Sequence, residues 1–272
     1  MAPARDENLN NLAVFDFDWS MVEQDSDYWT LMQLSPATYQ WVMQEKTSIQ
    51  WTDLMAAALS RLHDEGVKPT DIHQALEKIP FSPAMKELLE KLHNNNTTVL
   101  ILSDANTVFI ESILKANGVS KYINKIITNP GKFTEDGKLV VERLIPRDAP
   151  QHNCSNGCAA NICKGRELTK FLEEAGPFKR IMYVGDGKND YCPATLLGAD
   201  DKLFARTGKS LDALLKAKPE LTGNLHSKVQ HWSDPQEILT SVISEKCKQN
   251  SEDSAGSMSA PGVCTMPAIR FA

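Results

Sequence analysis

The sequence contains no apolar run that approaches the length of a membrane-spanning helix, and its first residues lack the apolar core of a signal peptide. We therefore expect a cytoplasmic protein with no membrane partner. Positive charge is also in deficit, because 29 Lys and Arg against 35 Asp and Glu give a formal net charge of −6. This balance argues against a nucleic-acid partner. No internal repeat is evident, and the sequence does not indicate an oligomeric state.

Cysteine is scarce, with six residues in 272. In a reducing compartment cysteines are free thiols or metal ligands more often than disulfides. Three of them, Cys154, Cys158 and Cys163, lie near His152 in the sequence. Cysteine and histidine are ligands of Zn²⁺, yet this spacing matches no regular zinc motif. Two hypotheses stay open, a zinc site or plain thiols with a structural or redox-sensitive role.

Short apolar runs that end in polar or glycine residues predict buried parallel strands. They cover residues 12–17, 98–102, 125–128 and 180–184, with a weaker candidate at 202–205. Helical patterns lie between them, as at residues 82–92, where Ser82 can cap the helix and Pro83 can open it. Strands that alternate with helices predict an α/β fold. We expect a doubly wound, mainly parallel, Rossmann-like sheet that binds ligands at the carboxyl ends of its strands.

The interval between the first two predicted strands is far longer than a crossover helix requires. It has helical patterns, and three of the five tryptophans fall between positions 29 and 51. We expect a helical cap at 28–81, inserted after the first strand of a catalytic core at 11–27 and 82–240; the alternative is an ordinary helical layer on the sheet. Residues 131–142 predict a β-hairpin that turns at Asp136-Gly137. Residues 246–272, rich in Ser, Gly and Pro, predict a disordered tail.

Two carboxylates, Asp16 and Asp18, stand at the end of the first apolar run. Side chains two residues apart on a strand point the same way, so these two should lie together. Two like charges at short distance are unfavourable unless a cation or a proton relieves the repulsion. The pair therefore predicts a cation and chemistry at this strand end, although a solvated acidic turn would show the same residues.

Side chains suited to phosphoryl chemistry follow three of the predicted strands. They are Asp16, Asp18 and Ser20 after the first, Ser103 and Asp104 after the second, and Asp186 and Asp190 after the fourth, with Lys164 in a helix-like run. Mg²⁺ prefers hard oxygen ligands. Asp16, the backbone carbonyl of Asp18, and Asp186 can supply three of them. Asp190 can hold metal-bound water or orient Lys164.

These residue types define a reaction. Asp16 can attack phosphorus to form an aspartyl-phosphate, and Asp18 can protonate the leaving oxygen and then activate water. Ser103 and Lys164, with Ser20, can hold the phosphoryl oxygens. The sequence thus predicts an Mg²⁺-dependent phosphatase that acts on small-molecule phosphate esters.

The same strings resemble the four motifs of the haloacid dehalogenase superfamily, and within it the phosphoserine-phosphatase-like branch. More narrowly, they resemble the family of phosphoethanolamine/phosphocholine and pyridoxal phosphate phosphatases over roughly residues 11–235. The motifs are Asp16-Phe17-Asp18, Asp25-Ser26-Asp27, Ser103-Asp104-Ala105-Asn106-Thr107, His152-Asn153-Cys154, Asn161-Ile162-Cys163-Lys164-Gly165 and the string from Gly185 to Pro193. The resemblance implies Asp16 as nucleophile, Asp18 as acid/base, Mg²⁺ as cofactor and a helical cap.

The resemblance also implies that Asp27 and Asp104 influence substrate choice. Two carboxylates beside the phosphate site would favour a cationic substrate such as phosphoethanolamine or phosphocholine, and would repel a second anionic group. The alternatives are that Asp104 only caps the following helix and that Asp27 faces solvent. Trp19 stands where relatives carry a charged or small polar residue, so we count it among the specificity residues, and Ser20 stands where they carry threonine.

Other functions stay open at this point. Pyridoxal phosphate, pyrophosphate and thiamine monophosphate are alternative substrates. From another class, a signalling receiver domain also places an aspartate, a Ser or Thr and a lysine at strand ends, but it needs neither the second aspartate, Asp18, nor a cap. A catalytically inactive binding protein would not need the complete set of side chains.

Overall fold

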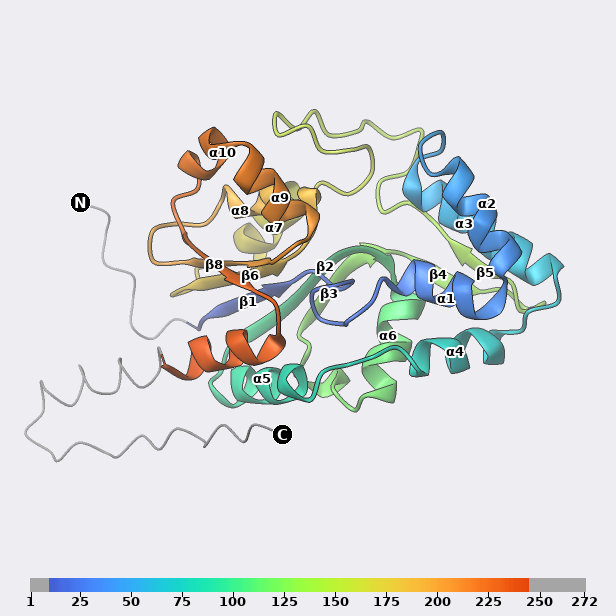
Figure 1. Ribbon diagram of the computed structural model, residues 1–272, viewed down its shortest axis with the longest axis horizontal. Coiled ribbons are helices and arrows are strands. Elements are labelled where there is room, and N and C mark those ends of the chain that lie inside the picture. Colours follow the sequence, from blue (N-terminus) through green and yellow to red (C-terminus); the bar gives the residue numbers. More distant parts are fainter. Residues whose placement is uncertain (1–9, 245–272) are drawn as a thin grey trace, which may run out of the picture.

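The computed structural model describes residues 10–244, which contain a six-stranded parallel sheet (Figure 1). The strands are β1 (Leu12–Phe15), β2 (Thr98–Asn106), β3 (Lys125–Asn129), β6 (Ile181–Gly185), β7 (Lys202–Arg206) and β8 (Lys228–Trp232), in the order β3-β2-β1-β6-β7-β8. Each neighbouring pair is parallel. The chain reverses its direction of progress beside β1, which confirms the predicted doubly wound α/β fold.

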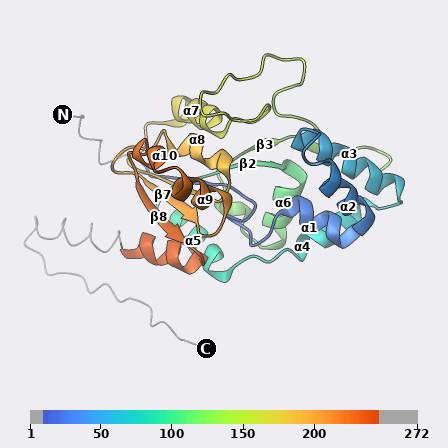
Figure 2. The ribbon, with the colours of Figure 1, turned by 45° about the horizontal axis from the view of Figure 1, so that its top comes forward.

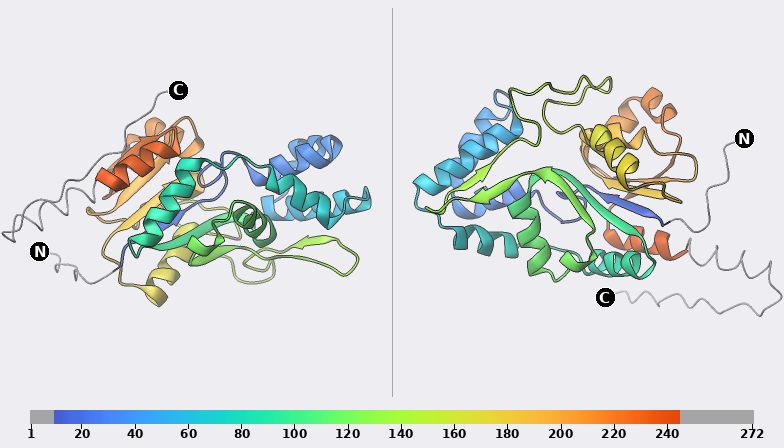
Figure 3. Two further views of the ribbon diagram at one scale, coloured as in Figure 1. Left: turned by 90° about the horizontal axis from the view of Figure 1, so that it is seen from below. Right: turned by 180° about the vertical axis from the view of Figure 1, so that it is seen from behind.

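Helices cover both faces of the sheet, as Figure 3 shows. Alternate residues of β1 enter opposite cores: Phe15 belongs to one hydrophobic cluster and Val14 to the other. The first cluster includes α5 (Pro83–Asn94), α6 (Thr107–Ala116) and the helical residues 235–244. The second includes α7 (Lys164–Ala175), α8 (Tyr191–Ala194), α9 (Ser210–Ala217) and Leu221 of α10 (Pro219–Gly223). Because β1 is buried on both faces, its four residues are all apolar.

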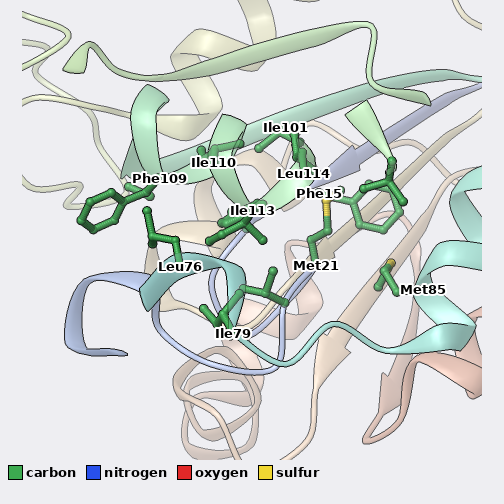
Figure 4. Packing of buried hydrophobic residues seen from close by; sticks show 14 of the residues in the cluster. Phe15, Met21, Leu76, Ile79, Met85, Ile101, Phe109, Ile110, Ile113 and Leu114 are labelled. Carbon is green, nitrogen blue, oxygen red and sulfur yellow. The ribbon is translucent and has the colours of Figure 1, made fainter. Parts of the chain in front are cut away.

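The interval after β1 is helical, as predicted. It contains α1 (Ser26–Leu34), α2 (Pro36–Glu45), α3 (Trp51–Asp64) and α4 (Pro69–Glu77). These helices extend past the carboxyl end of the sheet instead of lying on its faces (Figure 1). Helix α4 packs on α6, and Leu76 and Ile79 join the same apolar cluster as Phe109 and Ile110 (Figure 4).

The predicted hairpin is present as β4 (Gly131–Phe133) and β5 (Leu139–Val141), which pair antiparallel. It lies against the helical insertion, because β5 contacts α3 and the His63 imidazole is 3.5 Å from the carboxylate of Asp136 at the hairpin turn. The two chain passages that join the insertion to the sheet also meet, where the Glu23 N–H donates to the Pro80 carbonyl at 3.1 Å.

Several features differ from the prediction. Strand β2 continues to Asn106 instead of ending at residue 102, so Ser103 and Asp104 lie within the strand. Strand β1 ends at Phe15 instead of continuing to Phe17, because the Phe17 carbonyl accepts the N–H groups of Ser20, Met21 and Val22 in a tight turn. Edge strand β8 was not predicted, since Lys228–Trp232 has no continuous apolar run. A short 3₁₀ segment at Ser120–Tyr122 precedes β3, and another, Lys188–Asp190, follows β6.

No helix within residues 10–244 is both long enough and apolar enough to cross a bilayer. The predicted disordered tail, residues 246–272, lies outside the described residues.

Candidate active site

Three of the predicted carboxylates meet at the carboxyl end of the sheet. One oxygen from each of Asp16, Asp186 and Asp190 lies within 4.8 Å of the others. Asp16 follows β1 and the other two follow the adjacent strand β6, so parallel pairing of these strands brings them together. The strand-end arrangement inferred from the sequence is therefore present.

Lys164 joins this group as a buried cation. Its side chain is 1% exposed, and its Nζ lies 2.8 Å from an oxygen of Asp16 and 2.8 Å from an oxygen of Asp190. The lysine is the first residue of α7, whose N-cap is Cys163. Burial opposes the charge of Lys164 most strongly, but the charges of Asp16 and Asp190 outweigh it and hold the lysine pKa above its ordinary value.

Asp190 is fully engaged by the protein. One of its oxygens accepts from Lys164 and from the Tyr183 hydroxyl at 2.7 Å. The other accepts the N–H groups of Asp186 at 3.0 Å and Gly187 at 2.8 Å. Of the two roles predicted for Asp190, to hold metal-bound water or to orient Lys164, this arrangement favours the orientation of Lys164.

The electrostatics of the group suit a divalent cation. Burial is the largest cause that raises the pKa of Asp16, and the charges of Asp190 and Asp186 add to it while Lys164 opposes it. Burial and then Asp190 raise the pKa of Asp186 to about 7, against the opposing charge of Lys164. A bound cation would relieve this repulsion, and carboxylate oxygens are the ligands that Mg²⁺ prefers.

Asp18 points to a different part of the site. Its carboxylate accepts the Ser26 N–H at 2.9 Å, at the start of α1. Burial raises its pKa well above the ordinary value, and the charges of Asp25 and Asp27 raise it further. A raised pKa lets a carboxyl group hold its proton to higher pH, which suits Asp18 to protonate a leaving group. The side chain of Asp18 is not part of the three-carboxylate group, so a metal contact from this residue would have to come from its backbone.

The phosphate-binding candidates are enclosed. Ser103 is fully buried, and its hydroxyl accepts the Ala105 N–H at 3.2 Å. Ser20 is 1% exposed, and its buried hydroxyl has no hydrogen-bond partner among the described residues. The predicted phosphate contacts of both residues stay predictions.

Asp27 and Asp104, the two aspartates predicted to influence substrate choice, are not placed as the alternative interpretations of the sequence would require. Asp27 does not face solvent: it is 3% exposed and accepts the Trp51 indole N–H at 2.9 Å. Asp104 is exposed and accepts from the Asn189 amide at 3.2 Å, while the N-cap of α6 is Asn106. Asp27 is therefore not a solvated surface charge, and Asp104 is not the N-cap of α6.

A third carboxylate of this region, Asp25, was not predicted as a site residue. It caps α1 by accepting the Tyr28 N–H at 2.9 Å. Burial raises its pKa to about 6, with Asp104 adding to the shift. Burial also raises the pKa of Asp27, and Asp25 is the next largest cause. Asp25, Asp27 and Asp104 thus form one electrostatically linked cluster, which we call the acidic cluster.

Trp19 is held between two cations. The Lys209 Nζ lies 3.1 Å from the centroid of its ring, and the Arg206 guanidinium donates to its backbone carbonyl at 2.6 Å. Its backbone is left-handed, with φ of 56°. Lys209 interacts favourably with Asp186 and Asp25, although burial lowers its pKa. Trp19 therefore contacts a lysine that interacts with these carboxylates, a contact that the sequence did not indicate, and its predicted role in specificity stays a prediction.

The cysteine segment folds differently from the set considered in the sequence. The thiols of Cys154, Cys158 and Cys163 gather with that of Cys192, and the four sulfur atoms lie within 4.8 Å of one another. His152 is not a member, since its Nε2 is 2.8 Å from the Ala159 carbonyl. Cys192 belongs to the motif after β6, so the fold brings it from a separate segment.

Comparisons with known proteins also indicate a phosphatase. The sequence model of the family described as Putative Phosphatase matches residues 11–245. Inorganic pyrophosphatase 2 of Arabidopsis thaliana is 32% identical over 245 residues, which cover 88% of this chain and 86% of that protein. Pyridoxal phosphate phosphatase PHOSPHO2 of Bos taurus is 34% identical and covers 84% of this chain and 95% of that protein.

Phosphoethanolamine/phosphocholine phosphatase of Gallus gallus is 32% identical, with 87% of this chain and 90% of that protein covered. A substrate-bound phosphoserine phosphatase structure superposes with a TM-score of 0.55 at 16% identity and covers 86% of this chain and 99% of that one, which supports the fold. These relatives are phosphatases of different stated substrates, so they agree on the reaction and not on the molecule that carries the phosphate. The chain belongs to this phosphatase family, of the haloacid dehalogenase type.

Proposed function

We propose that this phosphatase hydrolyses small-molecule phosphate monoesters through a phosphorylated Asp16, with Mg²⁺ as cofactor. The observation that carries the proposal is the buried meeting of Asp16, Lys164 and Asp190 next to Asp186. Mg²⁺ held by Asp16 and Asp186 would neutralise phosphoryl charge.

Each residue then has a step that its position supports. Asp16 attacks phosphorus, so the bond between phosphorus and the ester oxygen breaks as the aspartyl-phosphate forms. Asp18 gives its proton to the departing oxygen, then takes a proton from the water that attacks the aspartyl-phosphate. Lys164, oriented by Asp190, holds phosphoryl oxygens together with Ser103. The helices α1 to α4 serve as a cap that contributes Asp25 and Asp27 to the site.

We further propose that the preferred substrate carries a positive charge near its phosphate. The acidic cluster is coupled to the proposed reaction centre, since the charge of Asp104 raises the pKa of both Asp16 and Lys164. A cationic substrate would relieve the repulsion that raises the pKa values of Asp25 and Asp27, whereas the second phosphate of pyrophosphate would increase it. Phosphoethanolamine and phosphocholine fit best, followed by pyridoxal phosphate.

The reaction is tested with two variants and an aryl phosphate that has a good leaving group. Asp16→Asn should lower turnover by at least about 10³-fold, because the nucleophile is lost. Asp18→Asn should still transfer phosphate to Asp16 but hydrolyse it slowly, so acid-stable phosphoenzyme should accumulate in that variant alone. Retention of Mg²⁺-dependent turnover by Asp16→Asn would refute the nucleophile.

Substrate choice is tested by the kcat/KM values for phosphoethanolamine, phosphocholine, pyridoxal phosphate, thiamine monophosphate and pyrophosphate. Asp27→Asn keeps the shape of the side chain, and we expect it to lower the ratio of phosphocholine to pyrophosphate by about tenfold or more. Asp64→Asn, at an exposed position of α3, is the matched control. An unchanged ratio in Asp27→Asn would refute the role of the acidic cluster while leaving the reaction intact.

A further inference from the structure

The four clustered cysteines have no part in the proposed reaction. Cys154 and Cys158 lie in the connection of residues 142–163, which contains no helix or strand and runs from the end of β5 to α7 (Figure 2). Cys163 is the N-cap of α7, and Cys192 lies in α8. Two separate parts of the chain therefore bring thiols together: the connection with its last residue, Cys163, and α8.

The spacing of the sulfur atoms has the dimensions of a metal site. The Sγ of Cys192 lies 3.4 Å from that of Cys154 and 3.7 Å from that of Cys163. Four thiolates placed tetrahedrally about 2.3 Å from a Zn²⁺ ion lie about 3.8 Å from one another. A disulfide would require one sulfur pair at about 2.05 Å, which neither of these distances approaches.

The surroundings also suit thiolate ligands. The Asn156 amide donates to the sulfur of Cys192 at 3.4 Å, and the Arg166 N–H donates to that of Cys163 at 3.5 Å. Such donors stabilise the negative charge of metal-bound sulfur. Gly165 allows the close approach, because a Cβ at this position would lie 2.5 Å from the sulfur of Cys192.

Two further observations concern how a metal ion would reach the cysteines and what it would stabilise. A cavity of ≈ 370 Å³ is lined by Cys154, Cys163 and Cys192 and opens to solvent, so an ion has a path to the sulfur atoms. Long connections without secondary structure need specific anchors to hold one conformation. Asn161, which lies between Cys158 and Cys163, anchors this one through its side-chain amide, which donates to Asn129 at 2.7 Å and Thr52 at 3.0 Å. The cysteine cluster would be a second anchor of the same connection.

We propose that Cys154, Cys158, Cys163 and Cys192 bind one Zn²⁺ ion as a closed tetrathiolate site. The site is structural: it ties the connection of residues 142–163 to the start of α7 and to α8. Binding displaces the thiol protons and leaves zinc with four sulfur ligands and no open position for substrate. The proposal does not depend on the phosphatase mechanism, and its tests do not require activity.

The first test uses the full chain, purified under reducing conditions and supplied with ZnSO₄. We expect about one zinc per chain by elemental analysis, and on Co²⁺ substitution the thiolate-to-cobalt charge-transfer band and intense d–d bands of a tetrahedral sulfur site. Removal of zinc by a strong chelator should lower the Tm, and ZnSO₄ should restore it. A chain that binds no zinc, that holds iron instead, or that gives the pale spectrum of octahedral Co²⁺ would overturn the proposal.

The second test assigns the ligands. Cys154→Ser and Cys158→Ser, both in the connection, should each weaken zinc binding by about 100-fold or more, since a ligand is lost. The matched control is Cys247→Ser combined with Cys264→Ser, two cysteines outside the described residues, which should keep the zinc content and the cobalt spectrum. Loss of zinc in this control, or full zinc binding in both ligand variants, would refute the assignment. If the ligand variants do not fold, the cobalt spectrum of the unmodified chain still decides.

Discussion

Lys164 offers the most direct test of how the site is held together. Its Nζ is 2.8 Å from both Asp16 and Asp190 and is almost completely buried. Lys164→Met would keep the length of the side chain and remove its charge, so two buried carboxylates would lose the cation between them. Removal of one partner from a buried ion pair costs about 3–5 kcal/mol. For a chain of this size that corresponds to a fall in Tm of about 6–20 °C.

Lys170→Met is the matched control. Lys170 is on the same helix and pairs with Glu167 at 2.7 Å, but its side chain is 46% exposed. An exposed pair contributes about 0–1 kcal/mol, so we expect the control to unfold within a few degrees of the unmodified chain. The assay is thermal and urea unfolding in magnesium-free buffer.

The effect of Lys164→Met should depend on pH. The folded-state pKa of Lys164 is raised, so its contribution is complete below the unfolded pKa of about 10.4 and is lost as pH rises through the folded pKa. Between pH 5.5 and 8 the lysine therefore stays charged, and the change comes from the carboxylates. In the variant they can bind a proton at low pH, which relieves their repulsion. A loss equal to that of Lys170→Met, or one that is the same at pH 5.5 and 8, would refute this account.

Three further predictions concern neighbouring groups. Burial raises the pKa of Asp186 to about 7, so its carboxyl group loses a proton as the pH rises toward 7. Apparent Mg²⁺ affinity should therefore increase about tenfold per pH unit below 7 and level off above it. Calorimetric titration from pH 5.5 to 8 checks this, and an affinity that does not change with pH would contradict it. Trp51→Phe removes the N–H that lowers the pKa of Asp27, so the pH above which phosphocholine is preferred should shift upward in a kcat/KM profile. Trp29→Phe, which loses a bond to the Ala75 carbonyl, should leave that pH unchanged, and equal profiles for the two variants would contradict the role of Asp27. Gly185→Ala would place a Cβ 2.5 Å from Asp190 and should lower the free energy of urea unfolding by about 1–3 kcal/mol. The control is Gly223→Ala, where the added Cβ meets nothing within 4 Å. Equal losses of stability in the two variants would contradict the steric argument.

The catalytic strand ends were predictable because each follows a continuous apolar run. Burial on both faces forces such runs in a parallel sheet, and parallel pairing brings their ends to one edge. Asp16, Ser103 and Asp186 follow from this rule alone. This rule does not predict strand β8, because β8 lies at the edge of the sheet and has exposed polar residues such as Lys228 and His231 in place of a continuous apolar run.

Residues that meet only through tertiary folding could not be predicted in the same way. Cys192 joins the other thiols because α8 and the start of α7 lie together, and no spacing rule links these segments. His152 was the nearer candidate in sequence, but its imidazole is used by the Ala159 carbonyl. Lys209 lies between β7 and α9, far from the carboxylates in sequence, and interacts with them only in the folded chain. The sequence offers one related feature, the unusual Trp19 that Lys209 contacts, and it indicates a specificity residue instead.

The meeting of Glu23 and Pro80 has an evolutionary consequence. The chain leaves the sheet and returns to it through two passages that are hydrogen-bonded to each other at 3.1 Å, and the Glu23 carboxylate is also held by Arg206 at 2.5 Å. Whatever lies between these passages starts and finishes at nearly the same point, so residues there can be gained, lost or replaced without altering the register of the sheet. Natural variation can thus exchange the helices between these two passages while the sheet and the side chains at its strand ends are retained.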